Sequence, residues 1–130
     1  MNQVIINDET LSGNILNTIE FDWKEEFITL EELISERVKS EVESYNNNAD
    51  ELYRGLVIPK DAEKVLNGFK IQISKKLDVE KQIYVALDGF MKNVYFVLVD
   101  DRQVEYLNEK LKISDRSKIA FVKLTPLVGG

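Results

Sequence analysis

The chain has 130 residues, 44% hydrophobic and 31% charged, a composition typical of one globular domain with a single core. It contains no cysteine and no histidine, which excludes thiol nucleophiles, Cys/His zinc sites, serine–histidine triads and histidine acid–base catalysis. The net charge of −6 argues against nucleic acids and anionic membranes as partners, because binding phosphates needs a dense basic surface. A protein partner is expected instead.

The start of the chain predicts a strand hairpin. Residues 4–10 read as the first strand, Ser12-Gly13-Asn14 as the turn, and residues 18–23 as the second strand. Apolar and polar side chains alternate strictly from Ile19 to Trp23, so one face of this strand should be half-buried.

A first helix is predicted from its capping signal. Thr29 and Glu32 have the spacing of a capping box, in which each side chain accepts a hydrogen bond from the backbone N–H of the other residue. The helix should end near Tyr45, because Asn46-Asn47-Asn48 compete with helical hydrogen bonds. Apolar residues at helical spacing form its buried stripe: Leu30, Ile34, Val38, Val42 and Tyr45.

The next segment, residues 49–78, is the least regular part of the sequence. Pro59 suits the first turn of a short helix through Leu66, and Gly68 suits the residue that closes it. A further helix is predicted over residues 79–92, with Asp78 as its N-cap.

The last third predicts strands. The apolar run of residues 94–99 reads as a central strand, residues 103–105 as a short extended piece, and residues 107–111 as a loop or turn. Residues 119–124 should form the closing strand, pairing in parallel beside the opening one. Helices and strands in this order indicate an α+β fold with a mixed sheet wrapped around the first helix.

The C-terminus is the candidate functional feature. Pro126 cannot donate to a sheet, and Gly129 and Gly130 have no side chain, so residues 126–130 should form a flexible tail that projects from a domain of residues 1–125. Such a slim tail can thread a narrow enzyme channel. The carboxylate of Gly130 can then attack the α-phosphate of ATP to give an acyl-adenylate.

Three runs of residues carry a resemblance to a known group, and the first of them, residues 97–104, resembles the ubiquitin-like strand and turn that precede the short fourth strand. The turn and strand Asp115-Arg116-Ser117-Lys118-Ile119-Ala120-Phe121, followed by Pro126-Leu127-Val128-Gly129-Gly130, resemble the closing strand and exit of the ubiquitin-like and MoaD/ThiS-like β-grasp carriers. The resemblance covers most of residues 3–45 and 94–130. It implies a β-grasp fold in which residues 46–93 are a helical insertion between the first helix and the third strand.

As a whole the chain resembles the larger bacterial ubiquitin-like modifiers. That resemblance implies that the chain is not an enzyme. Gly129 and Gly130 would be the reacting end, and Pro126, Leu127 and Val128 the segment that an activating enzyme grips. The activating enzyme uses the ATP, and the modifier itself binds no cofactor and no metal. A chain ending at Gly130 would need no proteolytic trimming.

The same resemblance implies the partners. These are homologues of activating and conjugating enzymes, a deconjugating peptidase and the target proteins. We expect no membrane contact and a cytoplasmic location, since no apolar run approaches the ~20 residues of a membrane-spanning helix and residues 1–3 do not resemble a signal peptide.

A second partner surface is expected on the strands. Family members often present an apolar patch there, which in this chain would draw on Leu98, Val122 and Leu124. Alternation along the strands does not decide which face is exposed, and a core position is favoured for Leu98.

Two other functions compete with a conjugated modifier. A sulphur carrier would be adenylated in the same way and then form a C-terminal thiocarboxylate, but the length of this chain and its insertion favour the modifier. A non-covalent adaptor domain would leave the two glycines without a role. An independent enzyme ranks last.

Overall fold

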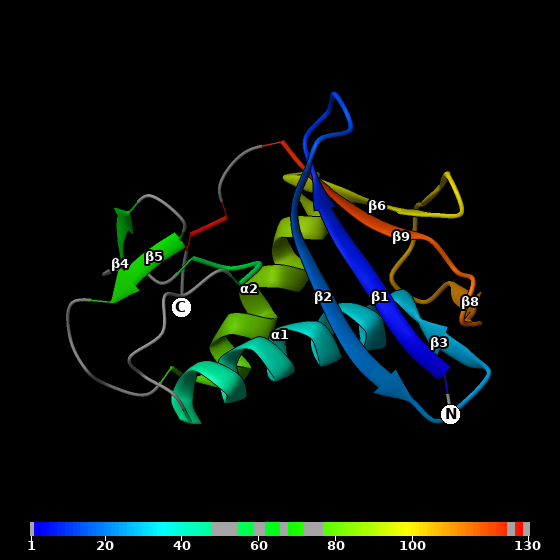
Figure 1. Ribbon diagram of the computed structural model, residues 1–130, viewed down its shortest axis with the longest axis horizontal. Coiled ribbons are helices and arrows are strands. Elements are labelled where there is room, and N and C mark those ends of the chain that lie inside the picture. The colour runs from blue at the N-terminus through cyan, green and yellow to red at the C-terminus, as the bar shows by residue number, and fades with distance from the viewer. Residues whose placement is uncertain are drawn as a thin grey trace.

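The computed structural model describes residues 2–47, 55–58, 62–65, 68–71, 77–124 and 127–128. It has the predicted α+β class, with a mixed sheet of five strands in the order β2-β1-β9-β6-β7 and helices α1 and α2 on one face of it (Figure 1). Two small antiparallel pairs, β3-β8 and β4-β5, lie outside this sheet.

The opening hairpin is confirmed. Strand β1 (Asn2–Glu9) pairs antiparallel with β2 (Ile15–Trp23), and Ile6 lies opposite Ile19. Gly13 occupies the turn with a φ of 88°, in the left-handed region that glycine adopts without steric cost. The N–H of Thr10 donates to the carbonyl of Asn14 at 3.0 Å and closes the turn.

Strand β9 (Ile119–Lys123) holds the sheet together. It pairs in parallel with β1, as predicted, and antiparallel with β6 (Tyr95–Val99), so it joins the first and last parts of the chain. The predicted strand at residues 94–99 is therefore confirmed, but the middle position belongs to β9. Strand β6 lies between β9 and the short β7 (Arg102–Val104).

Helix α1 (Leu30–Asn47) begins at the predicted capping box. The Thr29 hydroxyl accepts from the N–H of Glu32 at 3.1 Å, and the Glu32 carboxylate accepts from the N–H of Thr29 at 2.9 Å. The helix extends to Asn47 because Asn46 finds partners for its amide group outside the helix. Its Nδ2 donates to the Leu77 carbonyl at 3.2 Å, and its Oδ1 accepts from the Leu77 N–H at 2.8 Å.

Strand β8 was not predicted. Residues 110–112 lie partly in the segment expected to be a loop or turn, but they pair antiparallel with β3 (Phe27–Thr29), directly before α1. A strand of three residues is too short to show alternation in the sequence, and the distant partner strand determines its conformation.

The insertion, residues 46–93, combines a hairpin with a helix. A helix was predicted from Pro59 to Leu66, but Ala62–Val65 is strand β4, which pairs antiparallel with β5 (Gly68–Ile71). The prediction is therefore wrong for residues 62–65, while Pro59 and Leu66 lie outside the described residues. A run of four residues fits the periodicity of a helix and that of a strand, so the strand that pairs with it determines its conformation. Gly68 begins β5 instead of closing a helix.

Helix α2 (Val79–Met91) is confirmed. The Asp78 side chain accepts from the N–H of Lys81 at 3.2 Å and caps the helix as predicted. Neither α1 nor α2, the helices of the described residues, has the length and apolar character needed to cross a lipid bilayer.

The core lies between the sheet and the two helices. Strands β1, β6 and β9 contribute one wall and the stripe of α1 the other, and Leu56 and Val57 from the insertion close one end. The apolar residues buried most completely are Ile6, Leu30, Leu33, Ile34, Val42, Val57, Ala86, Val97, Val104 and Phe121.

Candidate functional site

The path of the C-terminal segment begins at the end of β9. The N–H of Leu124, the next residue, donates to the carbonyl of Val94 at 3.2 Å. Leu124 itself is 42% exposed. Of the predicted tail residues, Pro126, Gly129 and Gly130 lie outside the described residues, whereas Leu127 and Val128 are described.

Leu127 and Val128 lie against the body. Leu127 is half-buried and packs on the core, and its carbonyl accepts from the N–H of Ile58 at 2.6 Å. Ile58 and Val128 form a parallel β-bridge. The prediction that this segment projects from the domain is therefore wrong at these two residues. Removing the apolar Leu127 side chain from water lowers the free energy of the folded chain, and the bridge to Ile58 holds Val128. Val128 remains 55% exposed.

The predicted second surface lies on the sheet face opposite the helices. Leu98 pairs with Ala120 and Phe96 with Val122, while Tyr95, Val97 and Val99 face the core. The core position favoured for Leu98 is therefore wrong, since successive residues of a strand point to opposite faces. Leu98 is half-buried, but Val122 is only 4% exposed, so Val122 offers a partner little area.

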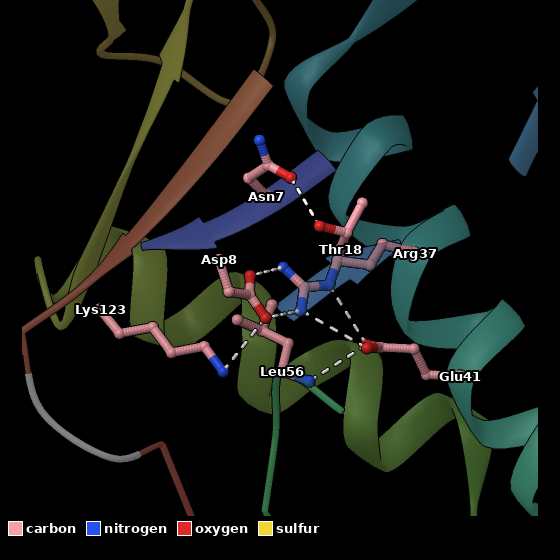
Figure 2. A network of polar contacts seen from close by, with 7 residues as sticks. All are labelled: Asn7, Asp8, Thr18, Arg37, Glu41, Leu56 and Lys123. Atoms are coloured by element: carbon pink, nitrogen blue, oxygen red, sulfur yellow. Dashed lines mark hydrogen bonds and ion pairs between the residues drawn. The ribbon is translucent and has the colours of Figure 1, made fainter. Parts of the chain in front are cut away.

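A buried ion pair lies between α1 and the sheet (Figure 2). The guanidinium of Arg37 donates from Nη1 to Oδ1 of Asp8 at 2.6 Å and from Nη2 to Oδ2 at 2.7 Å. The side chains of Arg37 and Asp8 are 0% and 1% exposed. The carbon Cζ of Arg37 also lies 4.7 Å from the centroid of the Phe121 ring, a cation–π distance.

Two further residues connect this pair to the exit of the chain (Figure 2). Glu41 lies 3.3 Å from Arg37 Nε and accepts from the N–H of Leu56 at 3.1 Å. Lys123, the last residue of β9, has its Nζ 3.5 Å from Oδ2 of Asp8. The network therefore positions two segments that flank Leu127: residues 55–58 and the end of β9.

The permanent positive charge of Arg37 gives this network a structural role. Burial disfavours its charged form, but the carboxylates of Glu41 and Asp8 outweigh burial and raise the pKa of Arg37 above its ordinary value. A guanidinium that stays protonated is no acid or base, so the network positions segments and transfers no proton. The sequence analysis missed it. The available signal was that both Asp8 and Arg37 occupy core-facing positions, two residues after Ile6 and three after Ile34.

Away from this network, the described surface offers few groups for catalysis or metal binding. A groove of about 420 Å³ lies between the start of α1 and the end of α2, with Phe90 in its wall and Glu31, Glu105 and Tyr106 around it. Within the described ranges no three Asp or Glu side chains come together as a metal-binding group.

The buried hydroxyl of Tyr95 should make the free energy of unfolding depend on pH. Its hydroxyl donates to the Ala86 carbonyl at 2.6 Å, and burial raises the pKa of Tyr95. Above the unfolded pKa of about 10 the unfolded chain loses this proton while the folded chain keeps it, so the free energy of unfolding should fall as pH rises. The variant Tyr95→Phe should cost about 1 kcal/mol near neutral pH, and that cost should shrink above about pH 10.

Urea unfolding of both proteins between neutral and alkaline pH checks this. The control is Tyr84→Phe, on a tyrosine of α2 that is 70% exposed. The difference in unfolding free energy between this variant and the unsubstituted protein should be the same at every pH. A cost of Tyr95→Phe that does not change with pH would contradict the prediction.

No protein-family model, curated protein or solved structure was found to match this chain. A proposal for the function therefore has to be based on the fold and on the path of the C-terminal segment. They define an α+β domain in which β9 of a mixed sheet pairs in parallel with β1 and is followed by the segment that contains Leu127 and Val128.

Proposed function

We propose that this chain is a bacterial ubiquitin-like protein modifier with a β-grasp fold. The resemblance of residues 115–121 and 126–130 to that group motivates the proposal. The observation that supports it most is the parallel pairing of β9 with β1 next to the opening hairpin. In this topology residues 124–130, which contain the two glycines, directly follow the middle strand of the sheet.

The reaction takes place on the main chain. The carboxylate of Gly130 attacks the α-phosphate of ATP, an acyl-adenylate forms, and pyrophosphate leaves. An enzyme thiol then displaces AMP to give a thioester, and a target amine displaces the thiol to give an amide. No side chain of the modifier takes part, which suits a chain without cysteine or histidine.

The partners follow from this sequence of steps. An activating enzyme binds ATP and grips Pro126, Leu127 and Val128, so that Gly129 and Gly130 reach the nucleotide. A conjugating enzyme receives the thioester, a peptidase reverses the modification, and the exposed Leu124 and half-buried Leu98 belong to a surface for these proteins. The proposed steps need ATP, and we propose a cytoplasmic location, where ATP is available.

The test is conjugation in cells followed by mass spectrometry. The chain carries an N-terminal affinity tag and is expressed with the activating-enzyme homologue of its own organism. Lys123 is the last basic residue, so trypsin should leave residues 124–130 attached to each modified lysine as a seven-residue remnant. The matched control lacks Gly129 and Gly130 and should give no remnant.

Two other products would overturn the proposal. A thiocarboxylate at Gly130, without adducts, would identify a sulphur carrier. Absence of both products, with partner binding unchanged after removal of the two glycines, would identify a non-covalent adaptor.

A further inference from the structure

The helix α2 has a glycine where the C-terminal segment crosses it. Gly89 is buried inside the helix. Glycine at such a position is about 1 kcal/mol less favourable than alanine. A Cβ at this position would lie 2.8 Å from Cδ1 and 3.1 Å from Cδ2 of Leu127. The Leu127 side chain therefore occupies the space that any other residue at position 89 would fill.

The main chain of the same segment is held by the insertion. Ile58 donates its N–H to the carbonyl of Leu127 at 2.6 Å and forms the parallel bridge with Val128. Ile58 follows Leu56 and Val57, which are buried in the core, and the Glu41 carboxylate fixes the N–H of Leu56. We call Gly89 and Ile58 together the tail seat.

The two components of the tail seat act on different parts of Leu127. Gly89 receives its side chain, and Ile58 binds its carbonyl oxygen. Both come from the insertion, residues 46–93. The insertion therefore contacts the residues that, in the proposed function, an activating enzyme must grip.

We propose that the insertion is a self-inhibitory docking site for the chain's own C-terminal segment. This inference rests on the proposed function. Leu127 cannot pack on Gly89 and enter an enzyme channel at the same time, so the seated and the activation-competent forms exclude each other. The apparent affinity for the activating enzyme is then reduced by the fraction of molecules in which the tail is released.

The variant Gly89→Ala tests this docking. The new methyl carbon would lie 2.8 Å from Cδ1 of Leu127, closer than two carbon atoms can approach, so the Leu127 side chain must leave its place on α2 while the helix itself gains from alanine. Hydrogen exchange of the Ile58 amide, measured by NMR, should accelerate roughly tenfold or more, because its acceptor on Leu127 is lost. The Leu56 amide, which donates to Glu41, should keep its exchange rate.

Two further variants distinguish the loss of tail docking from a change in helix α2. Leu127→Asn leaves α2 unchanged and should accelerate exchange at Ile58 in the same way. Met91→Ala, on a residue of α2 that is 66% exposed, is the matched control and should change nothing. Unchanged exchange at Ile58 in both Gly89→Ala and Leu127→Asn would overturn the seat, whatever the result for conjugation.

The regulatory part is tested with the activating-enzyme homologue by ATP–pyrophosphate exchange. For Gly89→Ala we expect the KM for the chain to fall by the factor by which the released fraction rises, with kcat unchanged. Faster exchange at Ile58 with an unchanged KM would overturn the inhibitory role and leave the proposed function intact. No pyrophosphate exchange with any variant would overturn the proposed function, and with it the inhibition, but not the seat measured at Ile58.

Discussion

Replacing Arg37 by methionine should lower the free energy of unfolding by about 3–5 kcal/mol. The substitution leaves the carboxylate of Asp8 buried, and the two short hydrogen bonds from the guanidinium are lost. Lys123, at 3.5 Å and 28% exposed, replaces only part of the lost charge. Urea unfolding at neutral pH measures the change.

A double variant and a control make this result specific. Arg37→Met combined with Asp8→Leu removes the two fully buried charges and leaves Glu41 and Lys123, which are 12% and 28% exposed and so reach solvent. The double variant should therefore recover most of the stability, because apolar residues of similar size often replace a buried ion pair without loss. Arg102→Met breaks the pair with Glu109 at 2.7 Å, whose side chains are 61% and 27% exposed. Because solvent screens an exposed pair, this substitution should cost far less than Arg37→Met. Equal costs for Arg37→Met and Arg102→Met would show that the Arg37 pair is not buried in solution.

The substitution Phe121→Ala should also cost about 3–5 kcal/mol. Phe121 is fully buried on β9, its ring stacks on Tyr95 with centroids 5.7 Å apart, and Arg37 lies over it. Alanine leaves a cavity where three parts of the molecule meet: the sheet, α1 and the aromatic cluster beside α2. Thermal or urea unfolding measures the loss.

The control for this cavity is Phe27→Ala. Phe27 lies on β3 and is 48% exposed, so its removal exposes little new apolar surface and should cost far less. Phe121→Leu should fall between the two, because leucine fills part of the space. A cost of Phe121→Ala below that of Phe27→Ala would contradict the packing of β9.

Elements with a strong local signal were predictable from the sequence. The capping box at Thr29 and Glu32 determines the start of α1 through its own side chains, and Asp78 does the same for α2. The alternation from Ile19 to Trp23 and the turn around Gly13 likewise identified the hairpin. In each case the determining interactions lie within a few residues of one another.

Features that depend on distant partners were not predictable. Strand β8 is short, and only its pairing with β3, which lies far away in the sequence, makes it a strand. Strand β4 has its partner β5 close by, but its four residues fit the periodicity of a helix as well as that of a strand. The Arg37–Asp8 pair joins residues 29 positions apart, and neither residue alone indicates a buried charge. The seat of Leu127 depends on Gly89, which in the sequence reads only as a weak point of a helix.

The position of β9 has a consequence for how the protein is made. Before residue 119 leaves the ribosome, β1 has only β2 as a partner in the five-stranded sheet, and β6 has only β7. Contacts between such distant parts of a chain form slowly. A nascent chain interrupted before residue 119 therefore holds two separate strand pairs, and the five-stranded sheet closes only when β9 enters between β1 and β6.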